Sequence, residues 1–310
     1  MNRERGVAII SVLLTVALAT IIVSGLFLRE HITVRSVTNR VDLTQARWIE
    51  RAAIDWSKVI LAADLKGGNE DHLGEPWAIP VLDTRLDETV TAGAKIDDDA
   101  RAATLSGQMI DAQSMFNLNN LILTSAENGV GISPANVQAF QKLLSMLDLP
   151  EAIAPAVAGR LLAAAQPPSQ DGEPAGALPM LRVNDLLSVR GVTPEVVQAL
   201  EPFVIFIPTS QPTKVNANTA PAEVLAAIIE DLDLSAAQQF VTQRERSFLR
   251  NLQELNDKLR KNVQADLVDF RTSYFLVRGL IRFGRVESFT ETLLHRQSQS
   301  NVRVIWQRRL

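Results

Sequence analysis

The side chains that most often carry out catalysis are sparse in this chain, and their spacing matches no familiar active site. The 310 residues include no cysteine and three histidines, which are His31, His72 and His295. The sequence has no glycine-rich phosphate loop and no evident set of nucleophile, base and acid. Asp and Glu are plentiful, and the sequence leaves open whether some of them meet in space as an all-carboxylate site. We interpret the chain as not being an enzyme.

Two acidic segments resemble metal-binding sequences in composition only. His72 lies between Asp71 and Glu75, but no second histidine falls within ligand spacing, so the segment is interpreted as a loop that caps its own backbone. The acidic triplet at 97–99 lacks the regular spacing and closing glutamate of a calcium loop and is interpreted as a solvated turn. No metal or cofactor site is therefore predicted.

The chain is organised around its first apolar run, from Gly6 to Leu28, which contains no charged residue. As a helix this run would be about 35 Å long, enough to cross the hydrocarbon core of a membrane. Neither Gly nor Pro occurs between Gly25 and Gly67, so one continuous helix is predicted from Val7 to about Leu65. Beyond the membrane its apolar face comprises Val34, Val37, Val41, Trp48, Ala52, Trp56, Val59 and Ala63.

The short basic leader that ends in Gly6 resembles that of the type IV pilin-like class. This resemblance implies that a prepilin peptidase cleaves between Gly6 and Val7 and that the new amino terminus of Val7 is methylated. Most members of the class carry a glutamate five positions after the glycine, where this chain has Ser11. In the class that carboxylate meets the amino terminus of the subunit ahead. Ser11 therefore implies a subunit that needs no other subunit ahead of it in the filament.

The charge balance argues against a nucleic-acid partner. The net charge is −4 and the isoelectric point is near 5.5. Two short helical units, 185–200 and a pair beginning at Thr219, resemble helix-hairpin-helix or SAM-like modules, which elsewhere often bind DNA. Since no basic face accompanies them, we interpret them as compact packing units. The two arginines before the apolar run favour a cytoplasmic amino terminus.

The rest of the chain divides into a helical part and strands. Helices are predicted to start at Ser133, at Thr193 and, through a capping box, at Ser235. Strand patterns cover 89–96, 103–111, 273–283, 286–296 and a third C-terminal strand at 302–306. We expect the C-terminal strands to form an antiparallel meander packed on the apolar face of the long helix.

Four further segments, read together with the leader, resemble one family throughout most of the chain. They are 71–78 (DHLGEPWA), 110–121 (IDAQSMFNLNNL), 187–193 (LSVRGVT) and 215–225 (VNANTAPAEVL). With the leader, they are similar in order to type II secretion protein K (GspK), the minor pseudopilin that lacks the glutamate. Relatives carry an acidic run before the VRGVT segment, and some bind calcium there. Here a proline-rich stretch with only Asp171 and Glu173 replaces it, so no calcium site is carried over.

The resemblance implies an α+β fold: a long transmembrane and spine helix on an antiparallel sheet, with a large inserted all-α domain. The implied divisions are a leader at 1–6, a transmembrane part at 7–28, a periplasmic helix at 29–66, a head at 67–120 and 271–310, and an inserted helical domain at 121–270.

The implied function is assembly at the tip of a periplasmic pseudopilus, which the protein initiates or caps for export of folded proteins. The implied partners are other minor pseudopilins of the GspI, GspJ and GspH types, the major pseudopilin, the prepilin peptidase and the inner-membrane assembly platform. Candidate contact residues are Ala8, Ser11, Val34, Val37 and Val41, although the valines could equally pack within the monomer. The alternative is a membrane-anchored helix-hairpin-helix DNA-binding protein of a competence system.

Overall fold

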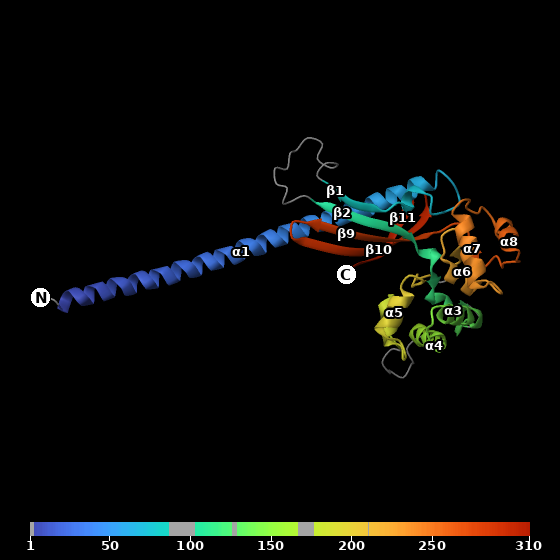
Figure 1. Ribbon diagram of the computed structural model, residues 1–310, viewed down its shortest axis with the longest axis horizontal. Helices are drawn as coiled ribbons and strands as arrows, with labels where there is room; N and C mark the ends of the chain where they lie inside the picture. The colour runs from blue at the N-terminus through green and yellow to red at the C-terminus, as the bar shows by residue number, and fades with distance from the viewer. Residues whose placement is uncertain (1–2, 87–102, 126–128, 167–176, 210) are drawn as a thin grey trace. The chain divides into compact units, whose positions relative to one another are not determined.

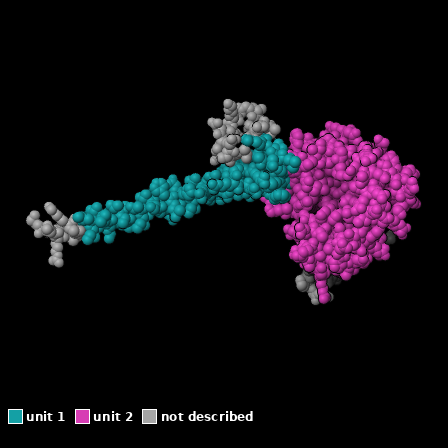
Figure 2. Space-filling view, in the orientation of Figure 1, with its two compact units in different colours: residues 1–53, 82–106, 279–289 teal, residues 54–81, 107–278, 290–310 magenta. Residues whose placement is uncertain are grey.

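The computed structural model describes residues 3–86, 103–125, 129–166, 177–209 and 211–310. These residues fall into two compact units, shown in teal and magenta in Figure 2. The first unit comprises residues 1–53, 82–106 and 279–289, and the second comprises 54–81, 107–278 and 290–310. The predicted strand at 89–96 and the turn at 97–99 lie outside the described residues.

The long helix α1 runs without interruption from Arg3 to Asp64, which confirms the continuous helix predicted from the sequence (Figure 1). At the standard rise its 62 residues extend about 90 Å. The helix ends just before Gly67 and Gly68, where the lack of a side chain makes helical backbone costly.

A five-stranded sheet has the strand order β1-β2-β9-β10-β11. Its strands are β1 (Val81–Arg85), β2 (Thr104–Asp111), β9 (Tyr274–Phe283), β10 (Val286–Ser298) and β11 (Asn301–Arg309). β10 and β11 pair antiparallel, from Thr290 opposite Arg309 to Ser298 opposite Asn301. The predicted strands at 103–111, 273–283, 286–296 and 302–306 are confirmed, whereas β1 was not expected.

In the first unit, α1 packs through Ala46 against Ile281 and Val286, the residues on either side of the β9–β10 turn. The turn is made by Gly284, which has a φ of +57° that other residues adopt with strain. A Cβ at this position would lie 3.1 Å from Oδ2 of Asp42 on the helix. Both the backbone angle and the close approach therefore require glycine here.

In the second unit, the end of α1 packs through Ile54 and Leu61 against Trp77, Phe275 and Leu294. Trp77 lies in the short 3-10 helix η1 (Pro76–Ala78) and meets Phe275 edge to face at 5.2 Å. Trp77 is fully buried, whereas Leu73 in the preceding loop is exposed.

The packing face of α1 differs from the expected one. The apolar stripe from Val34 to Val59 does not face the sheet in either unit, and Trp48 and Trp56 are each 66% exposed. The buried positions are instead Asp42, Ala46, Glu50, Ile54, Ser57 and Leu61. These positions recur every three or four residues, and none carries a side chain as large as tryptophan, so the strands can approach this face more closely than the stripe. The prediction that the meander packs on the stripe is therefore wrong.

The remainder of the second unit is mostly helical, as the sequence predicts. Its helices are α3 (Pro134–Met146), α4 (Ile153–Ala165), the 3-10 helix η5 (Val183–Ser188), α5 (Pro194–Leu200), α6 (Ala222–Ile228), α7 (Leu234–Arg244) and α8 (Leu252–Leu259). Ser133 and Thr193 cap α3 and α5 as predicted. For α7 the predicted cap at Ser235 is wrong, because Asp233, two residues earlier, accepts the hydrogen bond from the backbone of Ala236 at 2.8 Å.

Short strands and 3-10 helices connect these helices to the sheet. The strand pairs are β3 (Phe116–Asn117) with β6 (Val204–Ile205), β4 (Ile122–Ser125) with β5 (Gly129–Ile132), and β7 (Val215–Asn216) with β8 (Val268–Asp269). The 3-10 helices are η3 (Ala112–Ser114) and η4 (Leu118–Leu121). The helical core is apolar, with Phe116 stacked on Phe140 at a centroid distance of 5.8 Å.

Candidate assembly interface

The first part of α1 presents apolar side chains on all sides. Among the described residues one helix is long and apolar enough to cross a membrane, with a mean hydropathy of 2.6 in its most apolar stretch, none of which is buried in the protein. The hydroxyls of Thr15 and Thr20 each donate to the carbonyl four residues earlier, at 2.8 Å. These polar groups are thus satisfied within the helix, as a lipid environment requires.

The proposed processing and contact residues all lie on this helix. For Gly6, Val7 and Ala8 the backbone alone is described, and it is helical. Ser11 is exposed, and its carbonyl accepts the hydrogen bond of Thr15. The structure does not test the cleavage site or its methylation, which stay predictions.

The valine stripe is open to solvent. Val34, Val37 and Val41 are 57%, 57% and 48% exposed, so the alternative that they pack within the monomer is wrong. Three aligned β-branched side chains on one helix face are typical of a surface that another helix covers. The stripe is therefore available for contact with another protein.

A buried ion-pair cluster in the second unit involves the loop that contains DHLGEPWA. The Arg296 guanidinium donates through Nη1 to Oδ2 of Asp64 at 2.8 Å and through Nη2 to Asp71 and to the carbonyl of Thr272. It also lies 4.7 Å from the ring centroid of Phe275. Burial raises the pKa of both carboxyls, and the charge of Arg296 opposes that rise.

The acidic side chains of this loop already have partners. Asp64, Asp71 and Glu75 have carboxylate oxygens within 4.8 Å of one another, a spacing that a cation could bridge. However, Arg296 pairs with the two aspartates, and Glu75 accepts from the backbone of His72 at 2.9 Å and the indole of Trp77 at 2.8 Å. In the structure these carboxylates therefore serve as partners of Arg296, the His72 backbone and the Trp77 indole.

Each of the three histidines has its own surroundings within its unit. His31 is exposed on α1, His72 stacks on Phe248 at a centroid distance of 4.1 Å, and His295 stacks on Tyr274 at 4.3 Å. Nδ1 of His72 accepts from the backbone of Gly74 at 3.1 Å, which confirms that the loop caps itself. Burial, with a smaller contribution from Arg303, lowers the pKa of His295.

The VNANTAP segment takes part in a second buried network of hydrogen bonds. The carboxylate of Asp111 accepts from the backbone of Gln113 at 2.7 Å, from Nδ2 of Asn216 at 2.8 Å and from the hydroxyl of Thr219 at 2.6 Å. Complete burial raises the pKa of Asp111 to about 6, although hydrogen bonding to Thr219, Thr272 and Asn216 opposes the rise. Arg244, buried in α7, donates to the carbonyls of Ala217 and Ala220. The segment therefore joins the end of β2 to the helices.

The FNLNNL segment has the same structural role. Asn117 accepts from the backbone of Ile207 at 3.0 Å, and Asn120 both accepts from and donates to the backbone of Thr213, at 3.0 and 2.8 Å. These asparagines therefore satisfy the backbone groups of an irregular segment that lies about 90 residues further along the chain. The FNLNNL segment is thus a structural connector.

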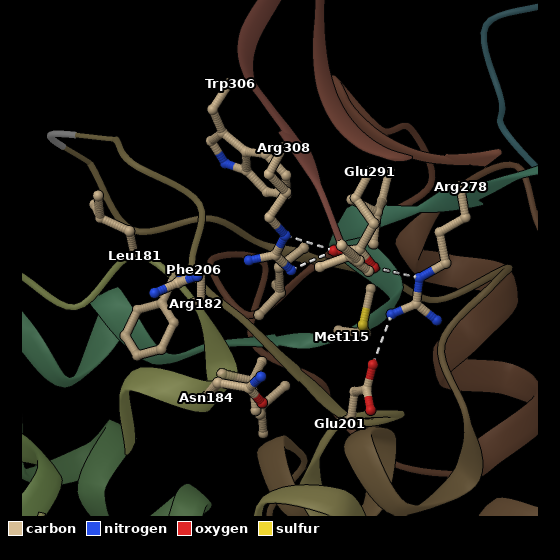
Figure 3. Close-up of a pocket in the computed structure, with 15 residues that line it drawn as sticks. Met115, Leu181, Arg182, Asn184, Glu201, Phe206, Arg278, Glu291, Trp306 and Arg308 are labelled. Atoms are coloured by element: carbon tan, nitrogen blue, oxygen red, sulfur yellow. Dashed lines mark hydrogen bonds and ion pairs between the residues drawn. The ribbon is translucent and has the colours of Figure 1, made fainter. Parts of the chain in front are cut away.

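A pocket that the sequence did not indicate lies beside the C-terminal strands in the second unit (Figure 3). Its volume is about 120 Å³. Arg278 and Arg308 approach the buried Glu291 from opposite sides, each with Nε 2.7 Å from a different carboxylate oxygen. Arg278 also pairs with Glu201 at 3.2 Å. The pocket floor is therefore a cross-strand Arg–Glu–Arg arrangement that spans β9, β10 and β11.

Two features define a pilin-like, membrane-anchored subunit. One is a lipid-compatible helix that continues as the spine of an antiparallel sheet, and the other is an inserted helical part. Family models described as "Type II secretion system (T2SS), protein K" match residues 114–209 and 215–271. In these two segments the chain is similar to the type II secretion system protein K family.

Relatives named type II secretion system protein K are similar along nearly the whole chain. The Pseudomonas aeruginosa protein is 29% identical, with 97% of this chain and 92% of that protein covered. The Aeromonas hydrophila protein is 26% identical, with 95% of this chain and 94% of that protein covered. The chain thus spans almost the full length of both relatives.

The fold is also that of a solved structure, the GspK-GspI-GspJ complex from enterotoxigenic Escherichia coli. The match has a TM-score of 0.62 at 20% identity and covers 88% of this chain and 99% of that chain. This likeness confirms the predicted fold class, a long helix on an antiparallel sheet with an added helical domain. The family match does not favour the alternative of a DNA-binding competence protein.

Proposed function

We propose that this protein is a minor pseudopilin of the type II secretion system that works by assembly rather than by catalysis. Its apolar helix anchors it in the inner membrane, with the amino terminus in the cytoplasm and the bulk of the chain in the periplasm. There it joins other minor pseudopilins at the tip of the pseudopilus, which it initiates or caps for the export of folded proteins.

The observation that carries this proposal is the exposed valine stripe on a helix that already packs through another face. α1 buries Asp42 and Ala46 against its own unit, whereas Val34, Val37 and Val41 remain open. An apolar stripe that the monomer does not use is typical of a helix that packs on another subunit. That the solved structure of similar fold is a complex with GspI and GspJ supports minor pseudopilins of those two types as partners. A partner of the GspH type is part of the proposal and has no such support.

The tip position rests on two features. Ser11 replaces the carboxylate that in pilin-like proteins contacts the subunit ahead, so no subunit is needed beyond this one. The helical part between about 121 and 270 adds far more mass than a filament repeat should tolerate laterally, whereas a filament end is unobstructed. Residues 1–6 would be removed by the prepilin peptidase before the assembly platform and the major pseudopilin engage the helix.

The proposal is tested by co-purification of the full-length protein with co-expressed minor pseudopilins in detergent. We expect V37E to weaken the complex at least tenfold, since a carboxylate would be buried in an apolar helix contact. S36E is the matched control, because the neighbouring residue points about 100° away around the helix and is also exposed. Equal loss with both variants, or none with either, would show that the stripe is not the contact.

A further inference from the structure

The last strand, β11, forms one edge of the five-stranded sheet. It pairs with β10 on one side, and no other described strand pairs with its outer side. Its nine residues include no proline, and Val304 and Ile305 are 39% and 38% exposed. An accessible edge of this length can accept a further strand through backbone hydrogen bonds.

The pocket lies along this edge. Trp306, Arg308 and Leu310 are alternate residues, and all three line it, with Leu181 and Arg182 on the side of the helical part (Figure 3). Residues directly opposite each other on neighbouring strands point to the same face of the sheet, and the strands lie about 4.8 Å apart. Alternate side chains of a strand added beside β11 would consequently project over the pocket.

The charge at this edge selects the kind of strand. β11 carries Arg303, Arg308 and Arg309 and no acidic residue, although the whole chain has a net charge of −4. Of these arginines, Arg308 pairs with Glu291 of β10, whose other carboxylate oxygen accepts from Arg278. A basic edge favours an acidic partner strand and disfavours pairing with a second copy of itself.

We propose that the outer edge of β11, with the adjacent pocket, binds an extended acidic segment of another minor pseudopilin by strand addition. The backbone of β11 supplies the affinity, and the pocket beside Trp306 and Leu181 supplies side-chain selectivity. This inference rests on the proposed function, since it assigns a second contact to the same assembly. It is separate from the valine stripe, which lies on α1.

Hydrogen exchange of the full-length protein, alone and in complex with co-expressed minor pseudopilins, tests strand addition directly. We expect amide exchange in residues 301–309 to slow by about tenfold or more in the complex, because the added strand protects edge amides. L181E should weaken the complex by about tenfold through repulsion of an acidic segment. L187E is the matched control, since Leu187 is 49% exposed and does not line the pocket.

The outcomes separate the two proposals. If no complex forms with the wild-type protein, the proposed function fails and this inference fails with it. If a complex forms but exchange in 301–309 is unchanged, or L181E and L187E behave alike, strand addition is refuted while the assembly function stands. Protection that rises with the concentration of the protein alone would indicate self-pairing and would also overturn the inference.

Discussion

The buried carboxyl of Asp111 should make the second unit less stable as the pH rises from about 4 to about 6. Asp111 is fully buried, and burial raises its pKa in the folded protein from 3.8 to about 6. In the unfolded chain the same carboxyl ionises near its ordinary value. Between the two pKa values the unfolded state has lost its proton while the folded state keeps it, which favours unfolding.

The size of the effect follows from the shift. A difference of about two pKa units corresponds to about 3 kcal/mol at roughly 1.4 kcal/mol per unit. The stabilising contribution is fully present below about pH 4 and is lost as the pH rises through about 6. Hydrogen bonding to Thr219, Thr272 and Asn216 opposes the shift, so this value is what remains after their contribution.

The assay compares wild type with D111N in denaturant titrations at pH 4, 5, 6 and 7, with the full chain in detergent and tryptophan fluorescence as the probe. Asparagine does not titrate, and the other ionisable groups largely cancel in the difference between the two proteins. We expect the free energy of unfolding of wild type, relative to D111N, to fall by about 3 kcal/mol across this range. D266N, at an exposed carboxylate, reports any general effect of removing a carboxyl group.

Two results would refute this reasoning. A difference between wild type and D111N that stays constant with pH would mean that the carboxyl keeps its ordinary pKa despite its burial. A difference that increases with pH would mean that the hydrogen bonds from Asn216 and Thr219 dominate burial and depress the pKa. A change in the denaturant slope with pH would instead indicate departure from two-state unfolding.

Three further predictions concern stability and are measured by denaturant or thermal unfolding. R296M should cost about 3–5 kcal/mol, because it leaves two buried carboxylates without their cation, and a loss below 1 kcal/mol would contradict the cluster. G284A should cost about 1–2 kcal/mol through its positive φ and the 3.1 Å approach of Asp42; an unchanged midpoint would refute this. W77A should cost about 3–5 kcal/mol and W48A less than about 0.5 kcal/mol, because Trp77 is buried and Trp48 is exposed; comparable losses would mean that the helix face is wrongly assigned.

Local signals in the sequence were sufficient for much of the secondary structure. The continuity of α1 follows from the lack of Gly and Pro between Gly25 and Gly67, and the starts of α3 and α5 follow from hydroxyl caps followed by proline. The strands β9 and β10 follow from alternation on either side of Gly284. Each of these features depends on residues that are close in the sequence.

Which face of α1 packs could not be deduced from its apolar pattern. The sequence has one strong apolar stripe, which by itself predicts packing on the monomer's own sheet. In the structure the sheet packs on Ala46, Ile54 and Leu61. Asp42, on the same face of the helix, is buried against the β9–β10 turn at Gly284. The prediction failed because hydrophobicity does not distinguish a surface that packs within a subunit from one that packs between subunits.

The buried polar networks could not be predicted from the sequence, because the residues that form them are far apart in the chain. Asn216 is 105 residues from Asp111, and Arg296 is 225 residues from Asp71. The segments that resemble the family contain most of these polar residues, but they do not indicate which residue pairs with which. For the pocket, the only sequence signal was the run of arginines in the last strand, which is equally typical of a protected sheet edge.

The central claim, that this chain is processed and assembled as a pilin-like subunit, is tested most directly at its amino terminus. Intact mass and N-terminal sequencing would be measured on the protein from cells with and without prepilin peptidase. We expect a mature chain that begins at methylated Val7 only when the peptidase is present. A chain that begins at Met1 in both cases would contradict it and would indicate an ordinary signal anchor.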